Sequence, residues 1–108
     1  MINDKIKELE GISSSRCSLI SYYISPKSSV DGVVKALEGE LTHAPIYVQS
    51  NLKKVLMFVK NFDKFPDNGI IIFAGDKESI TYLVPEKPVA LDLYRCDTKY
   101  FLDILKVL

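Results

Sequence analysis

Residues 94–100, Tyr-Arg-Cys-Asp-Thr-Lys-Tyr, carry side chains that can recognise a planar ligand with hydrogen-bonding edges. Tyr94 offers an aromatic ring for stacking and a phenolic hydroxyl that can both donate and accept hydrogen bonds. Cys96 is small, so the edge of a ligand can approach closely beside it. The alternation of Leu93 and Arg95 with Tyr94 and Cys96 is also ordinary strand patterning, which fits a structural role. The choice between these roles depends on the elements that surround the segment.

The first half of the chain predicts three helices and one strand. A short helix is expected over residues 4–10, ended by Gly11 and a serine run, and a strand rich in β-branched and aromatic residues over 17–24. Apolar residues then recur at helical spacing over 30–41, where the preceding serines can cap a helix, and again over 48–62. Pro45 lies between these two helices and separates them.

The second half predicts three strands and a closing helix. A turn at 66–69 leads into a buried strand at 70–74, a hairpin at 75–78 and a return strand at 79–84. Prolines bound a link to a fourth strand at 89–94, and a last helix follows Asp97 or Thr98 with its apolar side over 101–108. The order α-β-α-α-β-β-β-α predicts an α+β fold in one domain, 1–108, with a four-stranded, mostly antiparallel sheet covered by about four helices.

The composition limits the classes of partner. Fourteen basic and fourteen acidic side chains cancel, so any binding to RNA must be local rather than driven by a global field. No apolar run approaches the ~20 residues of a membrane-spanning helix, and the charged N-terminal segment does not resemble a signal peptide. We therefore expect a cytoplasmic protein without a membrane partner.

The chemistry-bearing residues are too few for most catalytic or metal sites. One histidine and two cysteines do not supply the four ligands of a structural zinc, and His43 has no nucleophile pattern nearby. There is no glycine-rich phosphate loop. Cys17 and Cys96 are expected as reduced thiols in the cytoplasm. We therefore expect no cofactor, no metal and no catalytic residue.

Residues 94–100 resemble the Tyr-x-Cys-x-x-x-Phe signature in the N-terminal domain of the class 1 translation termination factor of eukaryotes and archaea, with Tyr100 in place of the phenylalanine. The resemblance extends in order, with nearly matching spacings, from Ile6 through Lys99. It implies a domain that recognises the stop codon of mRNA in the ribosomal A site. Peptide release in that family depends on a Gly-Gly-Gln tripeptide in a separate middle domain, and this tripeptide does not occur here. A class 2 release factor GTPase is expected as a partner only through further domains that this chain lacks.

Two earlier segments carry part of the same resemblance. The family's first loop ends in Gly-Thr-Ser, which helps to discriminate purines; here Arg16 and Cys17 stand at the first two positions and Ser18 is retained. Arg16 can contact phosphate or a base face, or can simply be a solvated loop end. Glu40 matches a glutamate that contributes to the decoding pocket, where a carboxylate can accept hydrogen bonds from exocyclic amines.

The largest departure from the family lies at Tyr47-Val48-Gln49-Ser50, which matches Asn-Ile-Lys-Ser. Gln49 replaces a cationic donor by an uncharged amide, and Tyr47 can stack on an unpaired base or pack against its own helix. Residues 51–55 resemble Arg-Val-Asn-Arg-Leu, so Lys54 takes a basic position expected near small-subunit ribosomal RNA.

The resemblance thus implies one set of codon-binding residues and one set of additional RNA contacts. The codon-binding residues are Ser18, Glu40, Gln49, Ser50, Tyr94 and Cys96. The additional RNA contacts are Cys17, Tyr47, Val48, Lys53 and Lys54.

Two alternatives stay open because two of the three recognition elements are altered. A paralogue that binds the ribosome or protein partners without decoding stop codons is favoured by the loss of the lysine at Gln49. The retention of Tyr94 and Cys96 opposes it. A small enzyme or ligand-binding domain that shares only the fold would have a closed pocket beside Cys96 and a perturbed thiol.

Overall fold

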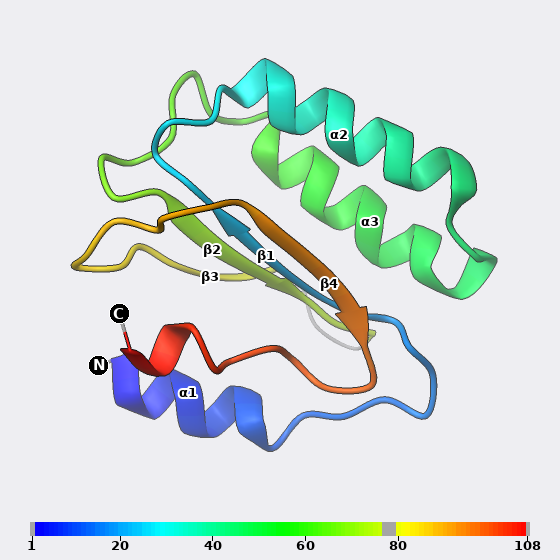
Figure 1. The fold of residues 1–108 in the computed structure, drawn as a ribbon. Helices are drawn as coiled ribbons and strands as arrows, with labels where there is room; N and C mark the ends of the chain where they lie inside the picture. Colours follow the sequence, from blue (N-terminus) through cyan, green and yellow to red (C-terminus); the bar gives the residue numbers. More distant parts are fainter. Residues whose placement is uncertain (1, 77–79, 108) are drawn as a thin grey trace.

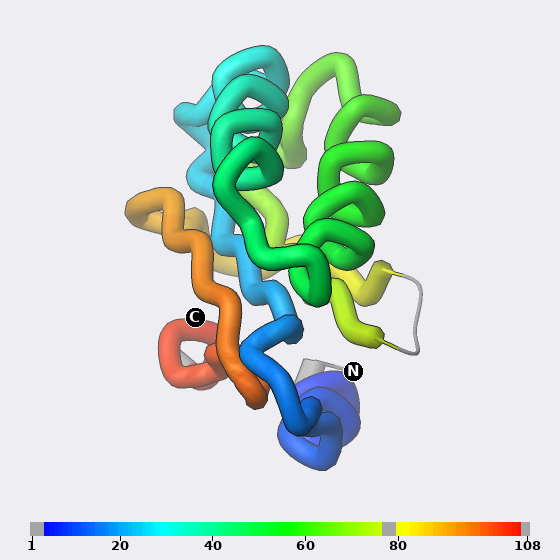
Figure 2. The backbone as a smooth tube through the Cα atoms, turned by 90° about the vertical axis from the view of Figure 1, so that its right-hand side faces the viewer, coloured from blue at the N-terminus to red at the C-terminus, as the bar shows by residue number. Residues whose placement is uncertain are grey.

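A central antiparallel sheet lies between two helical layers in the computed structural model, which describes residues 2–76 and 80–107, with side chains for 4–76 and 80–106. Helices α2 (Val30–His43) and α3 (Ile46–Val59) cover one face of the sheet. Helix α1 (Ile2–Glu10) and the C-terminal segment cover the other (Figures 1 and 2). The four strands β1 (Leu19–Ile24), β2 (Ile70–Ala74), β3 (Thr81–Leu83) and β4 (Leu93–Asp97) lie in the order β3-β2-β1-β4, and every neighbouring pair is antiparallel. The predicted α+β fold with an antiparallel sheet of four strands is confirmed.

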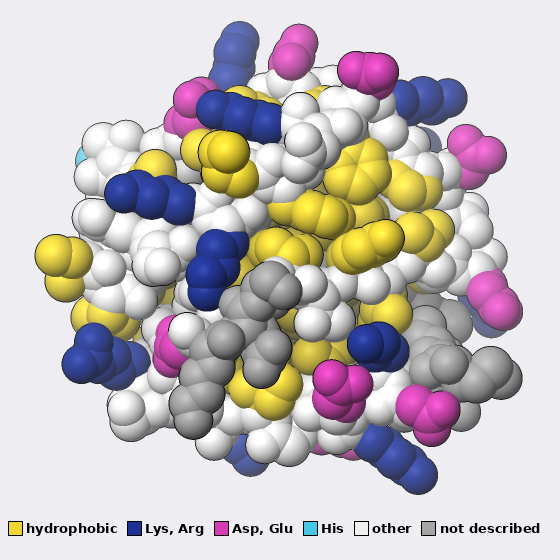
Figure 3. All heavy atoms as spheres, turned by 180° about the vertical axis from the view of Figure 1, so that it is seen from behind, with side chains coloured by type: hydrophobic (Ala, Val, Ile, Leu, Met, Phe, Trp, Pro, Cys, Tyr) yellow, Lys and Arg dark blue, Asp and Glu magenta, His cyan; other side chains and the backbone are white. Residues whose placement is uncertain are grey.

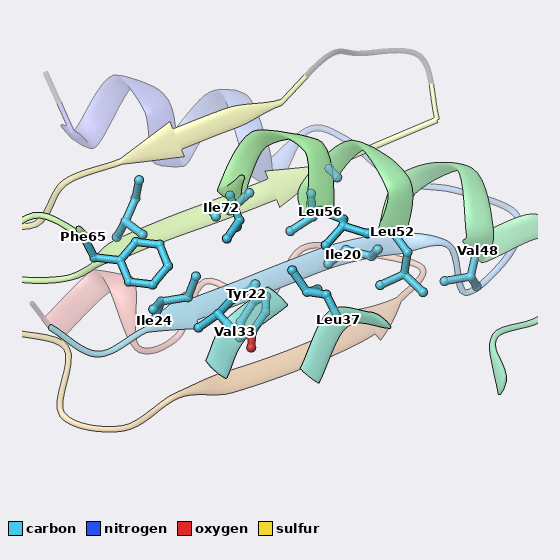
Figure 4. Packing of buried hydrophobic residues seen from close by; sticks show 14 residues of the cluster. Ile20, Tyr22, Ile24, Val33, Leu37, Val48, Leu52, Leu56, Phe65 and Ile72 are labelled. Carbon is cyan, nitrogen blue, oxygen red and sulfur yellow. The ribbon is translucent and has the colours of Figure 1, made fainter. Parts of the chain in front are cut away.

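The central strands β1 and β2 are buried on both faces, which explains their continuous apolar runs. Side chains that alternate along these strands pack into two separate hydrophobic cores, one on each face of the sheet. Ile20, Tyr22 and Ile72 pack under α2 and α3 (Figure 4), whereas Tyr23 and Phe73 pack on the side of α1. The sheet thereby fixes α2 and α3 as one layer.

Helix α2 begins at the predicted residue 30, but its end and both ends of α3 differ from the prediction. Ser29 caps α2 by accepting a hydrogen bond from the Gly32 amide, and α2 continues to His43 instead of ending at residue 41. Helix α3 starts directly after Pro45, two residues earlier than predicted, and ends at Val59 instead of residue 62. It ends early because the chain tightens into turns, in which the Phe62 amide bonds the Val59 carbonyl.

The predicted fourth strand at 89–94 is wrong by about four residues. Strand β4 is Leu93–Asp97, and its register pairs Tyr94 with Tyr22. Residues before it are held in a loop: the Val89 amide bonds the Asn68 carbonyl, and the Asp92 carboxylate accepts from Ser25 N and Ser28 Oγ, both at 2.7 Å. These contacts with the turn before β2 and the loop before α2 keep Val89 and Asp92 out of the sheet.

The predicted last helix, capped by Asp97 or Thr98 and with its apolar side over 101–108, is also wrong. The segment is irregular up to a single 3-10 turn, η1 (Leu105–Val107), so the described residues contain three α-helices instead of the predicted four. The Phe101 amide donates to Ser21 Oγ at 2.8 Å, and the Phe101 carbonyl accepts from the Tyr23 hydroxyl at 2.6 Å. Side chains of β1 thus occupy backbone groups that a helix would need.

The turns and edges complete the fold. Gly69, at the end of the predicted turn 66–69, has φ of 84°, and a Cβ there would meet the Ile24 carbonyl oxygen, so glycine is required. The predicted hairpin at 75–78 and the start of the return strand at residue 79 lie partly outside the described residues. Strands β1 and β3 are shorter than predicted, because β1 begins at Leu19 and β3 covers three residues.

The face behind the view of Figure 1 is rich in hydrophobic side chains (Figure 3). Beside the edge strand β3, Phe58 of α3 packs against Tyr82 with ring centroids 5.1 Å apart, and Tyr82 remains 52% exposed. No helix within the described ranges is both long and apolar enough for a membrane span.

Candidate nucleic-acid interface

One hollow brings together residues from three segments that are far apart in the sequence. It has a volume of about 270 Å³ and lies where the ends of β4 and α2 meet the start of α3. We call it the Tyr94 hollow, and it is lined by residues 43–45 together with Cys17, Glu40, Tyr47, Val48, Tyr94 and Cys96. Six of the eleven residues predicted to contact RNA therefore share one surface.

Tyr94 forms one wall of this hollow and is fixed from behind. Strand alternation directs Tyr94 and Cys96 toward the α2 and α3 side, while Arg95 lies over the Phe101 ring on the opposite side, 4.5 Å from its centroid. The Tyr94 ring packs edge-on against Tyr22 at 5.7 Å. Burial, with smaller contributions from Cys96 and Glu40, raises the pKa of the Tyr94 hydroxyl far above its ordinary value. The phenol is therefore a neutral hydrogen-bond donor at physiological pH.

Cys96 is half-buried and its thiol is held in the protonated form. Its Sγ donates to the Cys17 carbonyl, which ties β4 to the chain just before β1. Burial, and secondarily Cys17 and Asp97, raises the pKa of the Cys96 thiol to about 11. A protonated thiol is a poor nucleophile, so this perturbation is opposite to the one that an activated catalytic cysteine needs. Cys17 is exposed, and the two cysteines are not joined in a disulfide.

Glu40 places an exposed carboxylate at the rim of the Tyr94 hollow, one turn before the end of α2. Its negative charge contributes to raising the pKa values of both Tyr94 and Cys96, as expected for a neighbouring anion. Within the part of the chain that the structure describes, neither Glu40 nor the Tyr94 hydroxyl has a hydrogen-bond partner. Both groups can therefore bond an external ligand.

A second hollow, of about 400 Å³, lies on the other side of Tyr47. We call it the Asp76 hollow, and it is lined by residues 14–16 together with Ser18, Tyr47, Ser50, Asn51 and Asp76. Ser18 is 1% exposed, and its hydroxyl donates to Asp76 at 2.8 and 2.9 Å. The structure thus separates Ser18 from the Tyr94 hollow and engages its side chain internally.

Tyr47 divides the two hollows and contributes to both. Its ring is 40% exposed, and the Arg16 guanidinium lies over it, 6.0 Å from the centroid. This distance is at the outer limit of a cation–π contact. Val48, the next residue, points into the core under α3 and is buried.

The remaining predicted residues lie along the outer side of α3. Gln49, Ser50, Lys53 and Lys54 line an open groove with Ile46 and Met57. Gln49 Nε2 donates to the Ala44 carbonyl at 3.1 Å, so the amide at the position of the family's lysine turns back onto its own loop. Lys53 is exposed, whereas Lys54 is half-buried and donates from Nζ to the Gly75 carbonyl at 2.7 Å.

Five polar residues of the Asp76 hollow were not in the two predicted sets: Ser14, Ser15, Arg16, Asn51 and Asp76. Of these, Ser14 and Asn51 donate hydrogen bonds to Asp76. In the sequence, Asp76 belongs to a hairpin turn and Ser14 to a serine-rich loop, which accounts for both without a site. Asp76 follows the all-apolar strand β2 after a single glycine, a pattern that the hairpin turn explains equally well. Among the described residues, no cluster of three or more potential ligands could hold a metal ion.

Comparison with known proteins identifies relatives of the whole chain. The model of the family described as eRF1 domain 1 matches residues 1–108. The chain is 32% identical to "Peptide chain release factor subunit 1" of Archaeoglobus fulgidus, over 94% of this chain and 29% of that protein. It is 30% identical to "Eukaryotic peptide chain release factor subunit 1" of Trypanosoma brucei brucei, over 88% of this chain and 25% of that protein. The chain thus spans less than a third of the length of these relatives.

The fold is also found in a solved structure. A crystal structure of the archaeal translation termination factor aRF1 matches with a TM-score of 0.91 at 24% sequence identity, covering 97% of this chain and 33% of that one. At this identity, the match establishes the shared fold.

Proposed function

This chain belongs to the eRF1 domain 1 family, and on that premise we propose that it recognises stop codons in the ribosomal A site as the N-terminal part of a class 1 release factor. It acts as a binding module in the cytoplasm. The hydrolytic Gly-Gly-Gln domain and the contact with a class 2 GTPase belong to other domains. Its RNA partners are the mRNA stop codon and small-subunit ribosomal RNA.

The observation that carries this proposal is the convergence of Glu40, Tyr47, Tyr94 and Cys96 on one hollow. Unpaired bases are recognised by stacking on aromatic side chains and by hydrogen bonds to their edges. The Tyr94 hollow offers both kinds of contact, because two aromatic rings, one carboxylate acceptor and one neutral phenol donor face the same space. Base edges present amino donors and carbonyl acceptors, which match these groups.

The basic residues of α3 supply the local attraction that the neutral chain lacks as a whole. Lys53 is exposed on the groove outside α3, next to Ser50, which also borders the Asp76 hollow. In this arrangement Lys53 contacts phosphate and thereby sets the register of the codon, while the hollow contacts the bases. Lys54 contributes its charge from a half-buried position.

The second candidate function is a paralogue that binds the ribosome without decoding. One observation favours it: the Gln49 amide, at the position of the family's cationic lysine, is bonded to the Ala44 carbonyl. A side chain engaged in this way would have to give up that bond to reach the first base.

Peptide release distinguishes the two functions. The chain is joined to the middle and C-terminal domains of an archaeal class 1 factor and tested on matching ribosomes programmed with UAA, UAG, UGA and a sense codon. Decoding predicts release at one or more stop codons, lost with Tyr94→Ala and kept with the control Tyr82→Ala, which changes an exposed tyrosine of the opposite edge strand. A folded chimera that binds ribosomes but releases no peptide at any codon would exclude decoding and favour the paralogue function.

A further inference from the structure

The carboxylate of Asp76 accepts hydrogen bonds from two segments of the chain. Asp76 lies two residues after the end of β2 and is itself exposed. Ser14 donates to its Oδ2 at 2.7 Å, Ser18 donates to both oxygens, and Asn51 Nδ2 donates to Oδ1 at 3.0 Å. Ser14 and Ser18 precede β1, whereas Asn51 lies in α3. One side chain therefore connects the loop before β1 with the helix that carries Tyr47 and Ser50.

Asn51 makes the same connection a second time. It is 2% exposed, and its Nδ2 also donates to the Ser18 carbonyl at 2.8 Å. Its Oδ1 accepts from Lys54 Nζ at 3.1 Å, and Lys54 in turn donates to the Gly75 carbonyl. In the resemblance, an arginine of the family stands at the position of Asn51. An amide here can both donate to the strand ends and accept from Lys54, whereas a guanidinium has no acceptor for that second bond.

The network extends to the surface through Ser14. The Ser14 hydroxyl donates to Asp76 and accepts from the Arg16 amide at 3.2 Å. The Ser14 amide donates to the Thr98 carbonyl at 2.9 Å, which holds the same loop against the chain after β4. The Arg16 guanidinium then lies over the Tyr47 ring. The position of Arg16 beside Tyr47 thus depends on a loop that is tied to Asp76.

A hydroxyl has a single proton to donate, and the Ser18 proton is already engaged with Asp76 inside a side chain that is 1% exposed. Direct contact of Ser18 with a base would leave the Asp76 carboxylate without one of its donors. We therefore infer that Asp76 is the positioning residue of the codon-facing surface, and that Ser18 acts through Asp76 instead of contacting the codon. This inference rests on the proposed function, which supplies the codon.

In this account, Asp76 holds the loop at residues 14–18 and helix α3 in a fixed relation before RNA arrives. Tyr47 and Arg16 are then already in place when the codon enters. Less conformational entropy is therefore lost on binding. Loss of Asp76 leaves Glu40, Tyr94 and Cys96 in place but loosens the wall that Tyr47 provides to the Tyr94 hollow. Discrimination between stop and sense codons should therefore fall more than the release rate at the best stop codon.

The first test uses the 108-residue chain alone and measures amide hydrogen exchange by NMR. Asp76→Asn keeps the size of the side chain, removes its charge and turns an amide donor toward the donors of its neighbours. We expect exchange at Ser14 and Arg16 to become faster by about tenfold, while the Val89 amide, which bonds Asn68 at the far end of the sheet, keeps its rate. The control Glu86→Gln removes an exposed charge from the link before β4. It should leave the exchange rates of Ser14, Arg16 and Val89 unchanged.

Unchanged exchange at Ser14 and Arg16 in Asp76→Asn would overturn the inference. If Asp76→Asn instead accelerates exchange throughout the chain, the whole fold has been destabilised. The milder variant Ser14→Ala, which removes only one of the donors to Asp76, then tests the positioning role. A local increase at Arg16 in Ser14→Ala supports the positioning role, and no increase there refutes it.

The second test uses the release chimera and a double-mutant cycle. If Ser18 acts through Asp76, then Ser18→Ala lowers the stop-to-sense ratio in the original background and has little further effect in the Asp76→Asn background. An equal effect of Ser18→Ala in both backgrounds would mean that Ser18 contacts the codon itself. Because the exchange experiment needs no ribosome, a chimera that decodes nothing contradicts the proposed function, while the exchange rates still decide whether Asp76 holds the loop.

Discussion

The two hollows on either side of Tyr47 use polar side chains in opposite ways. In the Asp76 hollow, Ser14, Ser18 and Asn51 all donate to one carboxylate. In the Tyr94 hollow, Glu40 and the Tyr94 hydroxyl have no hydrogen-bond partner among residues 2–76 and 80–107. The first hollow is satisfied without a ligand, whereas the second presents an acceptor and a donor to whatever enters. The difference separates polar groups that are free to contact a ligand, in the Tyr94 hollow, from groups that hold the surface in shape, in the Asp76 hollow.

The largest expected effect is at Tyr94. Tyr94→Ala removes a stacking surface and a donor from the Tyr94 hollow and should reduce stop-codon-dependent release by about a hundredfold, since stacking alone contributes ~1–3 kcal/mol per base. Tyr94→Phe keeps the ring, so its smaller loss measures the hydroxyl. If Tyr94→Ala reduces release no more than Tyr82→Ala does, the Tyr94 hollow does not contact the codon and the contrast between the two hollows is wrong.

The next effect concerns stability and falls on the Asp76 hollow. Asn51→Ala should lower the free energy of unfolding by ~1–3 kcal/mol, because it leaves the buried Ser18 carbonyl without its donor. Chemical denaturation measures this directly. The matched control is Asn61→Ala, whose exposed amide bonds the Met57 carbonyl and which should cost less than about 0.5 kcal/mol. An equal decrease in the free energy of unfolding for the two variants would show that the hydrogen bonds of Asn51 do not stabilise the fold.

Thiol chemistry compares two residues that meet at the Tyr94 hollow. Burial raises the pKa of Cys96 to about 11, so little thiolate forms near pH 8, and Cys17 is exposed. We expect iodoacetamide to modify Cys17 at least tenfold faster than Cys96, as read by mass spectrometry of the intact chain and its peptides. Faster modification of Cys96 would instead support a small enzyme with an activated thiol.

The smallest effect is a titration. Hydrogen bonds, first of all from Ser14 and then from Ser18 and Asn51, with help from the charge of Lys54, lower the pKa of Asp76 below its ordinary value of 3.8. A carboxyl group whose pKa is lower in the folded state stabilises the fold above its unfolded pKa, and this contribution is lost as the pH falls through the folded pKa. The Asp76 carboxyl carbon should therefore titrate below 3.8 in NMR. Ser14→Ala should raise that pKa, whereas Ser15→Ala, an exposed neighbour, should not.

Much of the fold could be predicted because local signals agreed with the tertiary structure. Strand β2 was predicted at its observed residues, since a turn ending in Gly69 and five apolar residues leave little choice. The predicted position of β4 was too early in the chain because the alternating pattern of side chains continues on both sides of Leu93. The register is set by pairing with Tyr22 of a distant strand. The apolar spacing after residue 100 is helical, but Ser21 and Tyr23 take the backbone groups of Phe101.

The site could be predicted only as far as the family resemblance reached. Glu40 is an ordinary exposed helical residue in sequence, and its place beside Tyr94 depends on how α2 packs over β1 and β4 (Figure 2). Asp76 has no signal of its own, because its three donors come from positions 14, 18 and 51. A network between such distant positions requires the folded structure.

The central claim is that the Tyr94 hollow contacts the codon while the Asp76 hollow holds the surface. Photo-crosslinking tests it directly, with 4-thiouridine as the first base of a stop codon and the release chimera bound in the ribosomal A site. The account predicts that the labelled residues, located by tandem mass spectrometry, line the Tyr94 hollow, with Tyr47, Tyr94 or Cys96 among them. Efficient labelling of Ser14, Ser18 or Asp76, with none in the Tyr94 hollow, would contradict it.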